Sequence, residues 1–213
     1  MFDRIHIAGL RLGGVATCLA FCSLASAAQI ALPGATQDPA AIRAGTYQLD
    51  PHHGRITWSI NHMGFSTYVG QVPELKATLV LDPKNVAATT LRVTVDMSSI
   101  GTLYPPMDAN LKGPLYFDVA RYPTADFVSK QVIRTGKRTA DVDGMLTMHG
   151  TTRPVVLHVV FNQGAPNPKK NSYDVGFQGK ALIKRTDFGL DTGLDLVGNE
   201  ISLDLEGEFL LEK

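Results

Sequence analysis

Cysteine is scarce in this sequence of 213 residues, and both copies lie near its start. Cys18 and Cys22 fall within residues 1–28, a segment that we interpret below as a cleaved signal. Without that segment the chain has no thiol to form a disulfide, attack a substrate or bind a metal. We therefore expect the fold to depend on a hydrophobic core, which a chain of this length can form.

The sequence also lacks a charge imbalance and recognisable catalytic motifs. Basic and acidic residues both number 20, so no net charge draws the protein to nucleic acid or to anionic lipid. There is no GxSxG nucleophile elbow, no HExxH zinc motif, no P-loop and no dinucleotide-binding fingerprint. We therefore predict no nucleic-acid partner and assign no catalytic residues.

The first residues have the composition of a secretory signal. Arg4 and Arg11 precede an apolar run at 13–24, and the small residues at 25–28 offer a cleavage site. We predict a signal peptide over residues 1–28, cleaved near Ala27 or Ala28, and therefore expect the protein to be exported.

Two alternatives to cleavage stay open. The apolar run could remain as a membrane anchor, although it is short for a span. Residues 15–18 resemble a lipoprotein signal, although Thr17 is larger than the residue usual before the cysteine.

After the signal, residues 29–44 are rich in Ala, Pro and Gly without a period, which predicts a flexible leader. Residues 45–213 are then expected to form one domain.

The clearest structural signal is a hairpin over residues 144–161. Apolar residues alternate from Val155 to Phe161, and Gly150 lies in a turn where it can adopt a positive φ. A hairpin alone is marginally stable in water, so its apolar face requires further strands.

Alternation of apolar and polar residues recurs along the chain and predicts an antiparallel sheet. The segments are 55–63, 75–81, 91–97, 173–183 and 201–211, with a mixed pattern at 127–133. Asp143-Gly144 is one of several turn signals between them. Residues 105–118 instead place Met107, Leu111 and Leu115 four apart, which predicts a short helix near one end. About eight strands predict an all-β antiparallel fold, either a sandwich or a closed barrel, in which closure removes exposed edges.

The expected inward faces leave open whether the barrel is hollow or filled. The small inward residues Ala77, Gly179, Ala181 and Gly207 either leave space for an elongated apolar ligand or mark bends in a packed barrel. The residues predicted to line a channel are Trp58, Ile60, His62, Leu79, Val93, Val95, Phe127, Leu157, Val159, Phe177, Ile183 and Phe209.

Three polar residues are candidates for contacting the head group of a ligand. His62 shares the inward face of Trp58, where a buried imidazole needs either a ligand or a core group as partner. Arg185 continues the inward face of Ile183, so it either meets a polar head group or pairs with Asp187 to fix the strand end.

A metal site is a weaker alternative. Asp50, His52 and His53 share a turn, and His62 follows on the next strand, a grouping that a metal could use. The simpler interpretation is a turn plus one interior histidine, so we predict no metal.

Several motifs in this order resemble the YceI-like family of exported polyisoprenoid-binding proteins. They are Asp50-Pro51-His52-His53, Trp58, His62-x-Gly64, Ser99-Ile100, Phe117-Asp118-x-x-x-Tyr122-Pro123 with Phe127, Gly144-x-Leu146-Thr147-x-x-Gly150-x-Thr152-x-Pro154-Val155-x-Leu157 and Arg185-x-Asp187-Phe188-Gly189. The resemblance implies an all-β, extended lipocalin-like antiparallel barrel whose long apolar channel takes a polyprenyl lipid or quinone tail. It also implies a periplasmic location. The chain departs from the family pattern at Gly54, where Ser is usual, and at 107–111, where a more charged sequence is usual.

Together these features predict a periplasmic carrier that holds an isoprenoid-type or other long-chain lipid, with no cofactor besides that lipid. A structural or stress-response interaction module with a filled barrel is one alternative. An enzyme acting on a bound lipid through His62, Arg185 or Asp187 is another. The sequence leaves open the identity of the lipid, the formation of a homodimer and transient contact with a membrane.

Overall fold

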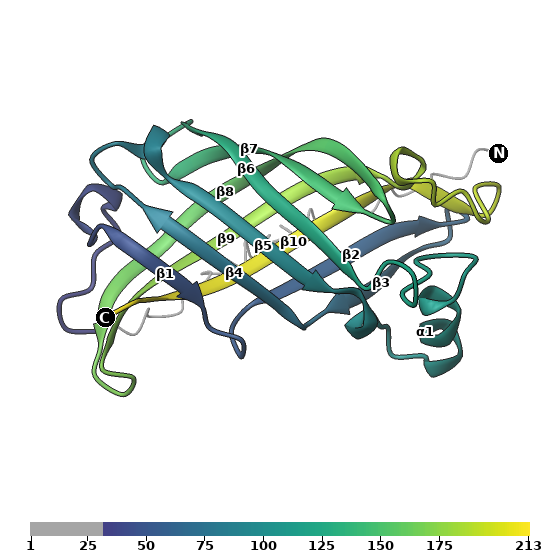
Figure 1. The fold of residues 1–213 in the computed structure, drawn as a ribbon, viewed down its shortest axis with the longest axis horizontal. Coiled ribbons are helices and arrows are strands. Elements are labelled where there is room, and N and C mark those ends of the chain that lie inside the picture. The colour runs from purple at the N-terminus through teal and green to yellow at the C-terminus, as the bar shows by residue number, and fades with distance from the viewer. Residues whose placement is uncertain (1–31) are drawn as a thin grey trace, which may run out of the picture. The chain divides into compact units, whose positions relative to one another are not determined.

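The computed structural model describes residues 32–213, and the structural statements below concern these residues. Ten strands form one antiparallel sheet: β1 Gly45–Leu49, β2 Arg55–His62, β3 Ser66–Val72, β4 Leu75–Leu81, β5 Thr90–Asp96, β6 Thr124–Arg134, β7 Thr139–Met148, β8 Thr151–Asn167, β9 Ser172–Lys184 and β10 Val197–Leu211. One α-helix, α1 Pro105–Lys112, lies at one end (Figure 1). Four short 3₁₀ helices complete the elements: η1 Pro39–Ala41, η2 Val86–Ala88, η3 Met97–Ser99 and η4 Arg185–Phe188.

Eight of the strands close into a barrel, which confirms the predicted fold. The order β1-β4-β5-β6-β7-β8-β9-β10 is closed by pairing of β1 with the end of β10 at Phe209 and Leu211. The earlier part of β10 pairs instead with β2, and β3 pairs with β2. These two extra strands extend the sheet at the end that carries α1 (Figure 1). The edge of β3 is paired in turn, because the main chains of Gln71 and Gly101 exchange hydrogen bonds of 2.8 and 2.9 Å.

The hairpin around which the sequence was interpreted is present as β7 and β8. His149 and Gly150 form its turn with φ values of 51° and 74°, as a two-residue hairpin turn with positive φ at both positions requires. The His149 ring is held at Nδ1 by the carbonyl oxygen of Phe188, at 3.0 Å, and meets the Tyr122 ring edge-on at 4.7 Å. These contacts hold a non-glycine residue in the left-handed region.

The prediction of a turn at Asp143-Gly144 is wrong, because both residues lie inside β7. A Cβ atom on Gly144 would lie 2.3 Å from the ring of Phe127 and 2.7 Å from the carbonyl oxygen of Val128. The glycine therefore marks a close approach of a neighbouring aromatic side chain, which is a common reason for glycine within a strand.

The predicted helical face is only partly correct. Helix α1 ends at Lys112, so Leu111 is buried and Met107 is half-buried, but Leu115 lies beyond the helix and is exposed. The sequence interpretation also missed β1 and β3. Strand β1 has only five residues, too few to show a period. Strand β3 contains Gly70, over which the Trp58 ring lies: a Cβ atom there would be 2.2 Å from that ring.

The signal peptide predicted over residues 1–28 lies outside the described residues. The described part of the predicted leader contacts the barrel: Thr36 pairs with Gly164, and Ile42 is buried. Tyr47 donates a hydrogen bond of 2.7 Å from its hydroxyl to the carbonyl oxygen of Arg43, whose guanidinium lies 4.6 Å from the centre of the Tyr173 ring. Among residues 32–213, no helix has the length and apolar character needed to span a membrane.

Candidate functional site

The barrel interior contains two separate apolar cavities. The larger has a volume of about 430 Å³ and lies at the α1 end, enclosed by β2, β3, the ends of several barrel strands and α1. Its volume falls within the range of about 300–1,000 Å³ that is usual for small-molecule sites. The lining is mainly apolar and comprises Ile56, Trp58, Ile60, His62, Tyr68, Val72, Val95, Met97, Ile100, Tyr104, Met107, Leu111, Tyr116, Phe117, Ala125, Leu146, Met148, Ile183, Arg185, Leu190, Thr192, Val197, Ile201 and Leu203.

The second cavity lies toward the opposite end and has a volume of about 140 Å³. Arg134, Lys137 and Arg138 border it at the turn between β6 and β7. A cavity of about 150 Å³ accommodates a molecule the size of benzene, so this space is too small for an isoprenoid tail.

The residues predicted to line one channel are divided among three places. Trp58, Ile60, His62, Val95 and Ile183 line the larger cavity. Leu79, Val159, Phe177 and Phe209 line the smaller one. Val93, Phe127 and Leu157 are absent from both linings.

A packed layer lies between the two cavities. On β6, Phe127 stands between Ala125, which lines the larger cavity, and Val132, which lines the smaller. Phe127 faces Val93 across the β5–β6 pair, and its ring fills the space above Gly144. The implied long channel is therefore interrupted in this structure, because a buried aromatic ring occupies its middle.

The inward glycines do not account for the open space. A Cβ atom on Gly207 would lie 2.7 Å from the Phe209 ring, and one on Gly179 would lie 3.4 Å from the side chains of Leu205 and Val159. Neighbouring side chains thus fill the volume that these glycines free. The larger cavity arises elsewhere, where β2, β3 and α1 widen the end of the barrel.

His62 lies at the mouth of the larger cavity. It is the last residue of β2, its side chain is exposed, and its ring centre is 6.3 Å from that of Tyr68. The expectation of a buried imidazole is wrong, because the strand ends at this residue and leaves the ring open to solvent. His62 nevertheless belongs to the cavity lining, so it stays a candidate for a head-group contact.

Arg185 is buried, and its guanidinium organises the loop between β9 and β10. Nε donates to the carbonyl oxygen of Gly198 at 2.9 Å, and Nη2 donates to that of Val197 at 2.8 Å. Nη1 donates to the carbonyl oxygens of Thr192 at 2.6 Å and Leu190 at 3.3 Å. A planar five-donor group suits such a set of main-chain acceptors.

The side chain of Arg185 also lines the larger cavity. Among residues 32–213, no carboxylate forms an ion pair with it. Burial lowers the pKa of the guanidinium, while the nearby Tyr116 and Asp191 raise it in part. The side chain thus places a partly desolvated positive charge beside an apolar cavity.

Asp187 does not pair with Arg185, contrary to one of the two predicted roles. It lies in η4 with its side chain exposed, beside Arg153 and Phe188 in a surface depression. It is absent from the lining of the larger cavity. His62, Arg185 and Asp187 therefore do not form a single group.

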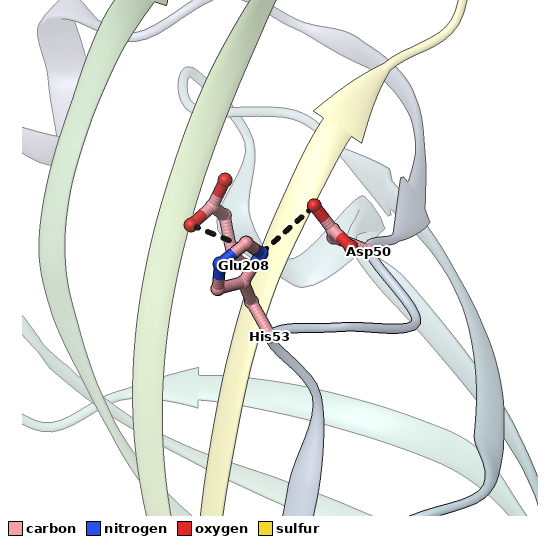
Figure 2. Close-up of side chains that lie close together, drawn as sticks. All are labelled: Asp50, His53 and Glu208. Atoms are coloured by element: carbon pink, nitrogen blue, oxygen red, sulfur yellow. Dashed lines mark hydrogen bonds and ion pairs between the residues drawn. The ribbon is translucent and has the colours of Figure 1, made fainter. Parts of the chain in front are cut away.

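The predicted cluster at the His52-His53 turn is separate from the cavity. Asp50, His53 and Glu208 lie together, with His53 Nδ1 2.9 Å from Asp50 Oδ2 and 3.9 Å from Glu208 Oε2 (Figure 2). These three residues could offer metal ligands. However, the Lys170 ammonium bonds to Asp50 and lies 2.6 Å from Glu208 Oε1, so the carboxylates already have a cation. His62 is not part of the cluster and lines the cavity instead.

This ion-pair cluster perturbs the charges of its members. Burial tends to raise the pKa of Asp50, but hydrogen bonds from Lys170, the His52 main chain and His53 outweigh it and hold that pKa well below its usual value. Burial tends to lower the pKa of Lys170, but its bonds to Asp50 and Glu208 raise it above its usual value. The cluster therefore links three parts of the chain by charge, namely the β1–β2 turn, the β8–β9 turn and β10, and we call it the clasp.

Alternation could not place the residues that line the larger cavity from irregular segments, among them Tyr104, Tyr116 and Thr192. Of these three, the sequence interpretation gave no role to Thr192. In the sequence, the one indication of this part of the cavity lining was the concentration of aromatic residues within residues 104–117. Trp58 in the cavity wall carries another unexpected feature: its Nε1 is buried without a hydrogen-bond partner.

The fold and its cavity define the molecule as a closed antiparallel barrel with a ligand-sized apolar interior. The family model described as "YceI-like domain" matches residues 47–209. A UPF0312 protein of Pseudomonas savastanoi pv. phaseolicola is 32% identical over 190 residues, covering 88% of this chain and 98% of that protein. The chain therefore belongs to the YceI-like family.

Solved structures share the fold. BcnA of Burkholderia cenocepacia superposes with a TM-score of 0.68 at 23% identity, covering 75% of this chain and 98% of that one. A polyisoprenoid binding domain from Saccharophagus degradans, implicated in plant cell wall breakdown, has a TM-score of 0.60 at 14% identity and covers 80% of this chain and all of its own. At such identities the likeness concerns the fold alone.

Proposed function

We propose that this protein is a periplasmic carrier that holds one isoprenoid-type lipid, such as a polyprenyl lipid or a quinone, in the larger cavity. The observation that carries the proposal is the cavity of about 430 Å³ with a mainly apolar lining. Burying a hydrocarbon tail there contributes about 25 cal/mol per Å² of apolar surface, which gives several kcal/mol without a specific polar contact.

The polar groups at the mouth set the expected orientation of the ligand. Arg185 and His62 lie among the lining residues, and Tyr116 lies close enough to influence the charge of Arg185. Polar side chains such as the exposed His62 favour a polar head group at the mouth, while the indole of Trp58 and the side chain of Ile60 contact the tail. We therefore expect the head group at the mouth and the tail toward Phe127.

Two further observations support this function over an enzymatic one. A structural neighbour is named as a polyisoprenoid binding domain. His62, Arg185 and Asp187, the residues considered for catalysis, do not converge, because Asp187 points away from the cavity lining into a separate surface depression. The proposed export rests on the signal predicted over residues 1–28, and the periplasmic location on the family resemblance.

A pair of alanine substitutions tests which cavity binds lipid. Ala125 lines the larger cavity and Ala140 lines the smaller, so Ala125→Phe and Ala140→Phe each add one ring to one of them. Lipid retained through detergent-free purification is identified by native mass spectrometry and extraction, and binding of a short polyprenyl alcohol is titrated.

We expect Ala125→Phe to weaken binding at least tenfold and Ala140→Phe to leave it unchanged, provided that circular dichroism shows both variants folded. If Ala125→Phe binds as tightly as the parent, the larger cavity is not the lipid site. A protein that remains empty after incubation with polyprenyl lipids and quinones would favour the interaction module instead.

A further inference from the structure

Exposed apolar side chains concentrate around the mouth of the larger cavity. Among residues 32–213, thirteen large hydrophobic residues are exposed, and seven of them belong to the turns and loops at this end. They are Met63, Phe65, Leu103, Tyr104, Leu115, Leu194 and Leu196, which we call the apolar rim. Such a concentration marks an interaction surface, whereas scattered exposed residues do not.

The rim is continuous because its segments are bonded to each other. Met63 donates from its main-chain nitrogen to the carbonyl oxygen of Leu196 at 2.9 Å, which joins the β2–β3 turn to the β9–β10 loop. The Thr192 hydroxyl donates to the carbonyl oxygen of Leu115 at 2.6 Å, which joins that loop to the segment after α1. Figure 1 shows the β2–β3 turn, α1 and the β9–β10 loop at the same end of the barrel.

The rim side chains project outward from the ends of tight turns. Met63 and Gly64 both have positive φ, at 55° and 73°, and the turn they make leaves Phe65 85% exposed. Leu103, just before α1, is fully exposed. Protruding apolar side chains on short turns suit insertion into a fluid interface, whereas a folded protein partner would need a matching set of pockets.

The rim is also continuous with the cavity. Tyr104 belongs to both, and His62 and Val197, the neighbours of Met63 and Leu196 in the chain, line the cavity. A lipid leaving a surface under the rim would therefore meet an apolar path to the interior.

The charges of the rim segments indicate the kind of surface. Residues 62–66, 102–107 and 113–117 carry no Asp, Glu, Lys or Arg, and residues 190–198 carry only Asp191 and Asp195. The intervening part of α1 adds one residue of each sign, Asp108 and Lys112. Attraction to anionic lipid requires a cluster of Lys or Arg near the membrane, and a single lysine does not supply one. The composition fits insertion into a zwitterionic lipid surface.

We infer that the apolar rim docks on a lipid bilayer, with the mouth of the larger cavity facing the membrane, so that lipid can enter or leave without crossing water. The inference rests on the proposed carrier function and adds the surface from which the lipid is exchanged.

Vesicle flotation tests the docking with a matched pair of variants. The purified protein, its N-terminus defined by mass spectrometry, is mixed with phosphatidylcholine vesicles, alone or with phosphatidylglycerol. The rim variant is Phe65→Ser with Leu103→Ser. The control is Val156→Ser with Leu182→Ser, two exposed apolar residues on the outer wall of β8 and β9.

We expect the parent and the control to bind phosphatidylcholine vesicles, with no gain from phosphatidylglycerol, and the rim variant to lose at least tenfold in bound fraction. Three results would overturn the inference that the rim docks on a bilayer. They are no binding by the parent, equal binding by the parent and the rim variant, and binding that requires phosphatidylglycerol. Self-association in ultracentrifugation that the rim variant abolishes would also overturn it by assigning the rim to a second copy.

The lipid-filling test and the docking test fail independently. Ala125→Phe blocks the cavity without touching the rim, so it should still float with vesicles. If Ala125→Phe retains lipid, the carrier proposal fails regardless of flotation. If lipid binding depends on the larger cavity but the parent does not float, docking alone fails.

Discussion

The two ends of the barrel differ although the same strands run through both. The α1 end holds a cavity of about 430 Å³ behind an exposed apolar rim, whereas the opposite end holds about 140 Å³ bordered by Arg134, Lys137 and Arg138. The difference comes from the added elements, because β2, β3 and α1 widen only one end. The barrel strands therefore form the wall at both ends, and the added β2, β3 and α1 determine which end has space for a ligand.

The largest expected effect comes from removing the ring that separates the two cavities. Phe127→Ala should join them and destabilise the protein by about 4 kcal/mol, because a buried aromatic side chain is lost from the core. Urea denaturation measures the stability, and native mass spectrometry should show retention of longer isoprenoids than the parent takes.

Gly144 supplies a matched test of the same layer. Gly144→Ala should cost about 2 kcal/mol, since its Cβ atom would lie 2.3 Å from the Phe127 ring. At Gly176 on β9 the nearest atom would be 3.7 Å away, so Gly176→Ala should cost much less. Equal losses at both glycines would mean that Phe127 does not fill the space above Gly144.

The next effect should be greatest at the α1 end. Arg185→Met removes the bonds to four carbonyl oxygens and should destabilise this end by about 3 kcal/mol. Hydrogen exchange should accelerate most in residues 190–198 and much less in β6 and β7. Arg185→Lys should rescue little, because one ammonium cannot reach the same set of acceptors. Uniform acceleration throughout the barrel would contradict the role of Arg185 as a local clamp.

The last effect concerns the clasp at Asp50 and depends on pH. The pKa of Asp50 is lowered in the folded protein, so its contribution to stability is present above the unfolded pKa and is lost as pH falls toward the folded value. Thermal unfolding should show the parent losing about 2 kcal/mol relative to Asp50→Asn as pH drops from about 5 toward 2. Parallel pH profiles for the two proteins would contradict this. Ligand binding in the larger cavity should be the same for both at neutral pH.

The sequence by itself determined the wall of the barrel. Alternation located the β7–β8 hairpin and most other strands, since the side-chain period of a strand is two residues and one face is buried. It placed Trp58, Ile60 and Ile183 on inward faces, and the structure places all three in the lining of the larger cavity. The motifs it contains were sufficient to indicate the YceI-like family.

Only the tertiary structure decided the shape of the interior and the roles of the polar residues. The Phe127 ring can divide the channel because Gly144 leaves room for it. Gly144 is seventeen positions away in the sequence, and the pairing of β7 with β6 brings it beneath the ring. Arg185 found its acceptors in main-chain carbonyls, which carry no sequence signal. The mouth is built from irregular segments without a period, so its lining and its apolar rim became visible only when those segments were brought together.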